Sequence, residues 1–212
     1  MLAYEQQLKE NRWWGVREGS RYFAGNNEVH KALRRITSRL EQLGIPYAVA
    51  GGMALYFHAY ARFTEDVDVL VSREGLERIQ QELRGRGYRP LFAGSKNLRD
   101  TEHGVRIEFI VSGEYPGDGK PKPVVFPDPG QASIERGGIH FLPLRELIEL
   151  KLASGMTNRG RLKDLADVQE MIRTLQLPLE FADGLNLYVR NEFRALWQSV
   201  HEPPTTEPTA PA

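Results

Sequence analysis

The sequence predicts an α/β (α+β) protein in which helices flank a short mixed β-sheet and a helical part follows. Segments 66–71 and 105–111 alternate apolar residues with charged ones, which is the period of a strand with one buried face. Other segments repeat apolar residues every three or four positions, as helices do. With 212 residues, of which 41% are hydrophobic, the chain is long enough to bury a substantial core.

The first 142 residues predict an arm followed by the sheet. Residues 1–26 mix aromatic pairs with charges, so we expect an arm packed on the body. A helix is expected over 27–43, because Asn27 is a good cap and Gly44 a good stop. The further expected elements are strands at 47–50 and 66–71, helices at 53–60 and 72–83, and a hairpin at 98–101 and 105–111.

The remaining residues predict a loop, a hairpin and three helices. Five prolines and three glycines make 115–130 an irregular loop, and a hairpin turning at Gly137-Gly138 is expected over 134–142. Helices are expected to begin at Pro143, near Leu162 and near Pro178, the third ending at Val200. The predicted division is an arm (1–26), a core (27–142), a helical part (143–200) and a disordered tail (201–212).

The composition excludes several classes of function. The chain has no Cys, which rules out disulfides, cysteine-ligated zinc and a thiol nucleophile. The 28 Lys and Arg residues balance 28 Asp and Glu, so no overall field attracts nucleic acid. No signal peptide is visible, and the uncharged run 44–61 contains Pro46 and adjacent glycines, unlike a membrane span. We therefore expect a cytoplasmic protein without a membrane partner.

Asp66 and Asp68 form the first candidate site. Residues i and i+2 of a strand share a face, so the two carboxylates point the same way while Val67 and Val69 point into the core. A divalent cation would relieve their repulsion, and paired carboxylates are ligands that Mg²⁺ takes. A solvated strand face is the alternative interpretation, because Asp-x-Asp alone has low specificity.

Two further features favour the metal site. Gly51-Gly52 ends a strand and opens a helix, where free N–H groups and the helix dipole suit a phosphate; a plain tight turn is the alternative. Glu108 lies on the polar face of the strand 105–111. A single strand Glu is more often just exposed, but beside a carboxylate pair it would add a third acidic ligand.

Together these residues resemble the nucleotidyltransferase superfamily that includes DNA polymerase β. The resemblance covers about 45–111: Gly-Gly, then thirteen residues, then Asp-Val-Asp, then an apolar strand with Glu. Two motifs look closest to those of small bacterial nucleotidyltransferases, Gly-Gly-Met-Ala-Leu-x₂-His and Arg-x-Thr-x-Asp-Val-Asp. Some of these proteins are toxins of abortive-infection and toxin–antitoxin systems. Segment 151–168 is also similar to the C-terminal part of that group.

The resemblance implies a nucleotidyltransferase fold and a role for each matching residue. Asp66 and Asp68 would hold two Mg²⁺ ions, with Mn²⁺ as a substitute, and Glu108 would complete the ion that activates the acceptor hydroxyl. Gly51 and Gly52 would approach the triphosphate. This chain departs from the superfamily in two ways, since Gly52 stands where Ser is usual and Glu108 where Asp is frequent. Neither departure removes the chemistry.

Four other side chains are expected to bind the nucleotide. Arg62 and Thr64 lie just before the aspartate pair, and Lys151 and Lys163 lie on the expected C-terminal helices. Each has an ordinary alternative, because cations commonly solvate a helix face and a Thr commonly caps a loop. Asp167 is expected to orient one of the two lysines or to be a surface acid.

The sequence therefore predicts an enzyme that moves a nucleoside monophosphate from a triphosphate to a hydroxyl and releases pyrophosphate. The acceptor is an RNA end such as that of a tRNA, a protein or a small molecule. The alternative is a catalytically weakened protein of this fold that binds a nucleotide or a cognate antitoxin. A small-molecule acceptor predicts a deep pocket walled by the C-terminal helices, whereas RNA predicts an open, basic rim.

Overall fold

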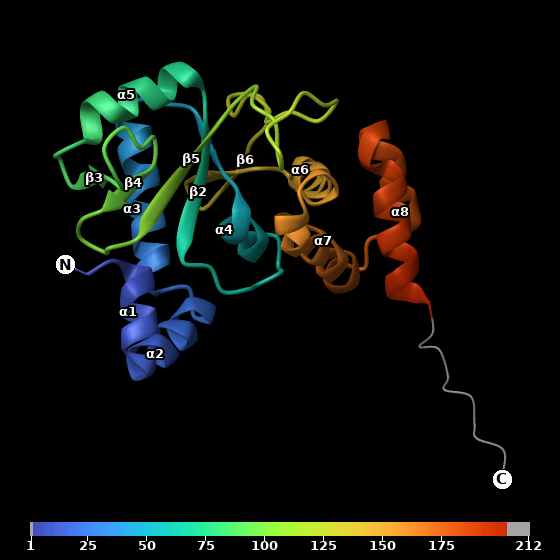
Figure 1. Cartoon of the computed structure of the whole chain (residues 1–212), viewed down its shortest axis with the longest axis horizontal. Helices are drawn as coiled ribbons and strands as arrows, with labels where there is room; N and C mark the ends of the chain where they lie inside the picture. Colours follow the sequence, from blue (N-terminus) through green and yellow to red (C-terminus); the bar gives the residue numbers. More distant parts are fainter. Residues whose placement is uncertain (1, 203–212) are drawn as a thin grey trace, which may run out of the picture.

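The computed structural model describes residues 2–202, so most of the predicted tail lies outside the described residues. Short strands alternate with helices, and the last helices stand apart from the sheet (Figure 1). The helices and 3₁₀ segments (η) are α1 (Tyr4–Glu10), α2 (Arg12–Phe23), α3 (Glu28–Gln42), α4 (Gly51–Phe57), α5 (Arg73–Leu83), α6 (Leu144–Thr157), η1 (Arg159–Arg161), α7 (Leu162–Leu175), η2 (Leu179–Gly184) and α8 (Leu187–His201). None of these helices in the described part combines the length and hydrophobicity that crossing a bilayer requires.

The strands form one mixed sheet, as the sequence predicts. They are β1 (Tyr47–Val49), β2 (Asp66–Val71), β3 (Tyr88–Pro90), β4 (Leu98–Asp100), β5 (Arg106–Val111), β6 (Ile134–Arg136) and β7 (Ile139–Phe141). Within residues 2–202 their order is β3-β4-β5-β2-β1-β7-β6. The β2–β5 and β1–β7 pairs are parallel, and the other pairs are antiparallel. Both predicted hairpins are confirmed, whereas β3 was not predicted.

The register of β2 against β5 determines which side chains of the candidate site lie next to one another. Asp66 pairs with Arg106, and Asp68 pairs with Glu108. Residues that are paired across neighbouring strands point to the same face, as do residues two apart along one strand. These four side chains therefore share one face of the sheet, and the intervening Val67 and Ile107, which are fully buried, lie on the other.

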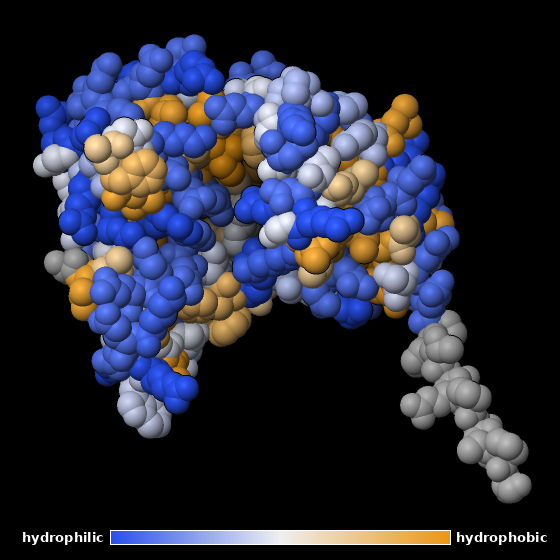
Figure 2. Space-filling model, viewed as in Figure 1, coloured by the Kyte–Doolittle hydropathy of each residue, from blue (hydrophilic) through white to orange (hydrophobic). Residues whose placement is uncertain are grey.

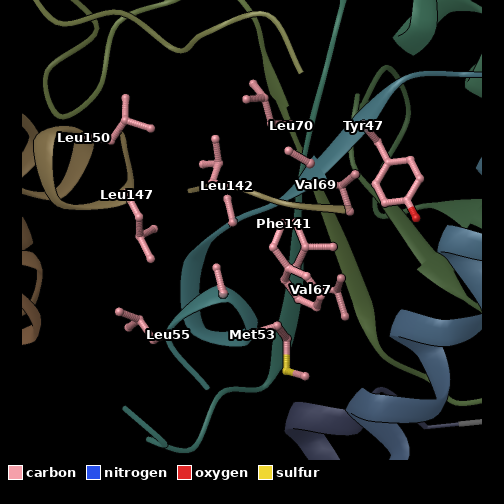
Figure 3. Close-up of a cluster of buried hydrophobic side chains, with 14 of the residues drawn as sticks. Tyr47, Met53, Leu55, Val67, Val69, Leu70, Phe141, Leu142, Leu147 and Leu150 are labelled. Atoms are coloured by element: carbon pink, nitrogen blue, oxygen red, sulfur yellow. The ribbon is translucent and has the colours of Figure 1, made fainter. Parts of the chain in front are cut away.

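The apolar face packs against α3, and the opposite face meets α6. Asn27 begins α3 by accepting a hydrogen bond from the backbone N–H of His30. This helix covers the sheet face that carries Val67 with a stripe of buried residues, namely Val29, Leu33, Ile36 and Leu40. On the other face, Leu147 and Leu150 of α6 belong to the same buried cluster as Leu142 (Figure 3). The sheet is thus covered on one face, while α6 and the acidic face enclose a cleft.

The N-terminal helices α1 and α2 pack on the body. Tyr4 and Tyr22 are fully buried. The ring centroid of Tyr22 lies 5.1 Å from that of Phe63, so α2 supports the loop that leads into β2. Trp13, by contrast, remains 81% exposed. The tyrosines, and not the tryptophan pair as a whole, anchor the arm.

The prediction for the third C-terminal helix is wrong in its first third. Residues 179–184 form the 3₁₀ segment η2, and Leu185 then takes an extended backbone (φ −82°, ψ 157°). The side chain of Asn186 starts α8 by accepting a hydrogen bond from the backbone N–H of Tyr188. A local cap thus restarts the helix after the break. The predicted start at Pro143 is off by one residue, because Pro143 is the N-cap of α6.

Candidate active site

A cleft of about 330 Å³ lies between the acidic face of β2 and β5 and the helices α6 and α7. This volume is within the range of small-molecule binding sites. Figure 2 shows the surface hollowed between these two parts, with hydrophobic residues in the hollow and hydrophilic ones around it. All nine residues singled out from the sequence line this cleft: Gly51, Gly52, Arg62, Thr64, Asp66, Asp68, Glu108, Lys151 and Lys163.

The backbone of Gly51 lies directly against Asp68. Gly51 has a φ of +56°, and a Cβ built on it would lie 1.8 Å from Oδ2 of Asp68. A side chain at this position would therefore be strained by the backbone conformation and would also collide with the carboxylate. The turn after β1 requires glycine here, which brings main-chain atoms next to the acidic cluster.

The position of Thr64 explains why residue 52 is a glycine. A Cβ at Gly52 would lie 2.6 Å from the Cβ of Thr64 and 2.8 Å from its Oγ1. The side chain of Thr64 therefore occupies the space into which a serine at position 52 would project. This contact explains why the chain has Gly where Ser is usual. The hydroxyl group beside the glycine turn is then that of Thr64.

The surroundings of Asp68 destabilise the ionised form of its carboxyl group. Burial, together with the neighbouring charges of Asp66 and Glu108, raises the pKa of Asp68 to about 7. Among the described residues, no hydrogen bond to its side chain is found. A group whose charged form lacks compensation at neutral pH is a candidate cation ligand.

Asp66 is held from two sides. Oγ1 of Thr64 donates a hydrogen bond of 2.8 Å to its Oδ1, and the guanidinium of Arg106 donates one of 2.7 Å to its Oδ2. Nε of Arg106 also lies 3.0 Å from Oε1 of Glu108. Arg106 is not among the site residues predicted from the sequence, although the alternation along 105–111 places it on the same face as Glu108.

A buried cluster of charges joins the loop before β2 to the C-terminal helices. Arg62 donates two hydrogen bonds to Asp167, of 2.6 and 2.9 Å. Nζ of Lys151 donates one of 2.7 Å to Asp167 and one of 2.9 Å to Asp164. Asp167 thus orients Lys151, one of the two roles expected for it, and it also binds Arg62. Arg62 and Lys151 line the cleft, and both are paired with carboxylates.

Asp164 completes this cluster. Burial by itself would raise the pKa of Asp164, but the charge of Lys151 and hydrogen bonds from Lys151 and Ser154 lower it below its usual range. Asp164 is therefore ionised at neutral pH, and it also pairs with Nε of Arg161 at 3.2 Å. Arg161 and Lys163, at the start of α7, line the cleft as well.

The donor set suits a hard divalent cation, because Asp66, Asp68 and Glu108 supply only carboxylate oxygens. In the arrangement observed, no three acidic or histidine side chains of residues 2–202 gather as a metal-binding group. The guanidinium of Arg106 instead bridges Asp66 and Glu108. The residue types fit a metal ion, while two of the three carboxylates are directed at an arginine.

A mixed sheet carrying three carboxylates beside a glycine turn, with helices closing the cleft, defines the class of enzymes that transfer nucleotidyl groups. A profile of the family described as "Uncharacterised nucleotidyltransferase" matches residues 17–186. The chain therefore belongs to this family and is a nucleotidyltransferase. Enzymes of this class generally use divalent metal ions.

Several solved structures resemble this one. The structure of ANT(2'')-Ia in complex with adenylyl-2''-tobramycin superimposes with a TM-score of 0.50 at 10% identity, covering 81% of this chain and 98% of that chain. JHP933 from Helicobacter pylori has a TM-score of 0.46 at 16% identity, covering 82% and 90%. The first likeness supports the nucleotidyltransferase fold and nothing finer. A comparison with curated protein sequences finds no match, and a toxin–antitoxin role stays a prediction.

Proposed function

We propose that the protein transfers a nucleoside monophosphate from a nucleoside triphosphate to a hydroxyl group, using Mg²⁺ held by Asp66, Asp68 and Glu108. The observation that carries this proposal is the in-register parallel pairing of β2 and β5, which puts Asp68 beside Glu108. The three carboxylates face one cleft, and the backbone of Gly51 adjoins them.

In this reaction the acceptor oxygen forms a bond to the α-phosphorus as the bond from that phosphorus to the bridging oxygen breaks. Pyrophosphate leaves, and the acceptor hydroxyl loses its proton. Two bound divalent ions would supply charge neutralisation at the attacking and leaving oxygens. The chain contributes the position of the reactants, because Thr64 and the glycine turn fix one wall of the cleft and such positioning lowers the barrier.

The walls of the cleft favour a small-molecule acceptor. Leu147, Leu150 and Ser154 of α6 form one wall, and Ile110 and Phe126 extend it on the side of β5. A pocket closed by the C-terminal helices is the arrangement expected for a small hydroxylated acceptor, whereas an RNA end needs an open basic rim. An adenylylated small molecule is also bound in the similar structure of ANT(2'')-Ia.

The proposal is tested by incubating the protein with Mg²⁺ and each α-³²P-labelled nucleoside triphosphate. The acceptors are supplied as separate pools of small molecules, RNA and protein. We expect label to move to the small-molecule pool and pyrophosphate to appear. Transfer into the RNA pool alone would refute the acceptor class, while leaving the reaction type standing.

Variants connect the reaction to the site. Asp66→Ala and Asp68→Ala are expected to abolish transfer without unfolding the protein, because Asp68→Ala relieves repulsion among the carboxylates and Asp66→Ala removes only the contacts with Thr64 and with the partly exposed Arg106. Glu77→Ala removes an exposed acid of α5 and serves as the matched control with full activity. Retention of full transfer by Asp68→Ala would overturn the metal assignment.

A further inference from the structure

Arg106 lies where the acidic cluster needs a positive charge. It is the partner of Asp66 in the β2–β5 register, and it precedes Glu108 by two residues on the same strand. The fold therefore places one guanidinium on the same face as three carboxylates. One positive charge leaves this group of four with a net negative charge, which suits a further cation.

The guanidinium uses the oxygens that a metal ion would use. It binds Oδ2 of Asp66 at 2.7 Å and approaches Oε1 of Glu108 to 3.0 Å. A lone pair that accepts a hydrogen bond from arginine is not available for coordination at 2.0–2.1 Å, the distance that Mg²⁺ requires. Because the other oxygen of Asp66 accepts from Thr64, Arg106 and a metal ion compete for the same carboxylate pair.

Arg106 is also less firmly held in the cleft than Lys151 and Arg62 are. Its side chain is 39% exposed, whereas that of Lys151 is 7% exposed and that of Arg62 is 19% exposed and held by two hydrogen bonds to Asp167. Partly exposed ion pairs are weak. A guanidinium on a flexible stem that turns away from Asp66 remains in the cleft, where a polyphosphate would meet it.

We propose that Arg106 is a displaceable internal cation, which occupies the Asp66–Glu108 pair until a divalent metal ion replaces it and which then binds the phosphates of the incoming nucleoside triphosphate. The inference rests on the proposed function, since it takes these carboxylates as metal ligands. It adds that Arg106 opposes the binding of metal alone and favours the binding of polyphosphate, so that the two ligands enter together.

The test measures the two ligands separately and does not use turnover. Binding of Mn²⁺ alone is followed by the loss of the free-ion signal in electron paramagnetic resonance. Binding of inorganic tripolyphosphate is followed by calorimetry in excess EDTA. Both are measured for the full chain and for Arg106→Gln and Arg106→Lys. Arg89→Gln, which removes an exposed arginine of β3, is the matched control for charge.

Arg106→Gln is expected to bind Mn²⁺ about tenfold more tightly and tripolyphosphate several-fold more weakly. Arg106→Lys retains the charge but not the fork that reaches two carboxylates, so its Mn²⁺ affinity should lie between the two. These opposite changes separate the proposal from a structural role, which would weaken both ligands. Unchanged or weaker Mn²⁺ binding by Arg106→Gln would overturn the inference alone. If neither the folded wild type nor Arg106→Gln binds Mn²⁺, the metal site of the proposed function fails, and the inference fails with it.

Discussion

Replacing Asp167 by Asn should destabilise the protein strongly, although the two side chains have nearly the same size. The carboxylate of Asp167 is 2% exposed and accepts hydrogen bonds from both Arg62 and Lys151. Asn keeps one acceptor oxygen but loses the negative charge. Lys151 would then keep the carboxylate of Asp164, whereas Arg62 would lose the carboxylate with which it is paired.

The structure sets the size of this effect. Breaking a buried ion pair by removing one partner costs roughly 3–5 kcal/mol. The lower end applies here, because Lys151 keeps Asp164 and because the side chain of Arg62 is 19% exposed and reaches water. We expect a loss of about 3 kcal/mol. With a urea slope of about 2 kcal/mol/M for a chain of this size, the unfolding midpoint should fall by about 1.5 M.

Urea unfolding followed by circular dichroism measures this shift. The matched control is Glu170→Gln, which makes the same acid-to-amide change on the same helix at an exposed ion pair with Arg173. Its effect should stay within about 0.5 kcal/mol. Arg62→Gln and the double variant with Asp167→Asn complete a cycle that isolates the Arg62–Asp167 interaction.

A fall in the midpoint as small as that of Glu170→Gln would refute the view that Asp167 joins the C-terminal helices to the sheet. A coupling energy near zero in the cycle would show that Arg62 is solvated and does not depend on Asp167.

Three further outcomes follow from individual residues. Gly51→Ala should lower the melting temperature more than Gly44→Ala, because both have positive φ but only Gly51 would place a Cβ 1.8 Å from Oδ2 of Asp68; equal shifts would contradict the collision. Since the pKa of Asp68 is raised to about 7, ionisation of Asp68 should increasingly destabilise the metal-free protein as pH rises from about 4 to 7, and urea midpoints in EDTA should show that Asp68→Asn gains stability relative to the wild type over this range. Burial, with a smaller contribution from Arg34, lowers the pKa of His30 to about 4, so His30 acts in the opposite direction and its contribution to stability should be lost as pH drops from about 6.5 toward 4, which is measured as the difference between the wild type and His30→Gln. An unchanged acid profile for His30→Gln would disprove that assignment.

Local patterns in the sequence predict most residues of the candidate site. Alternation along 66–71 assigns Asp66 and Asp68 to one face, because side chains of a strand alternate whatever the surroundings are. The glycine pair marks a turn for an equally local reason, since only glycine tolerates the backbone of Gly51 next to Asp68. This is why the residues chosen from the sequence all line the same cleft.

Other features depend on contacts between distant segments. The hydrogen bonds between Arg62 and Asp167 span 105 positions, and no local pattern predicts them. The break at Leu185 within an otherwise helical stretch was missed for a related reason, because Asn186 caps a new helix only where η2 ends.

The sequence by itself determined which residues carry acids, glycines and cations, and on which face of each strand or helix they lie, because these properties depend on neighbours only a few positions away. The tertiary structure decided that β5 lies parallel to β2 in the register that puts Glu108 beside Asp68 and Arg106 beside Asp66. Strand order and register result from packing of the whole chain, so only the folded protein shows which charge faces which.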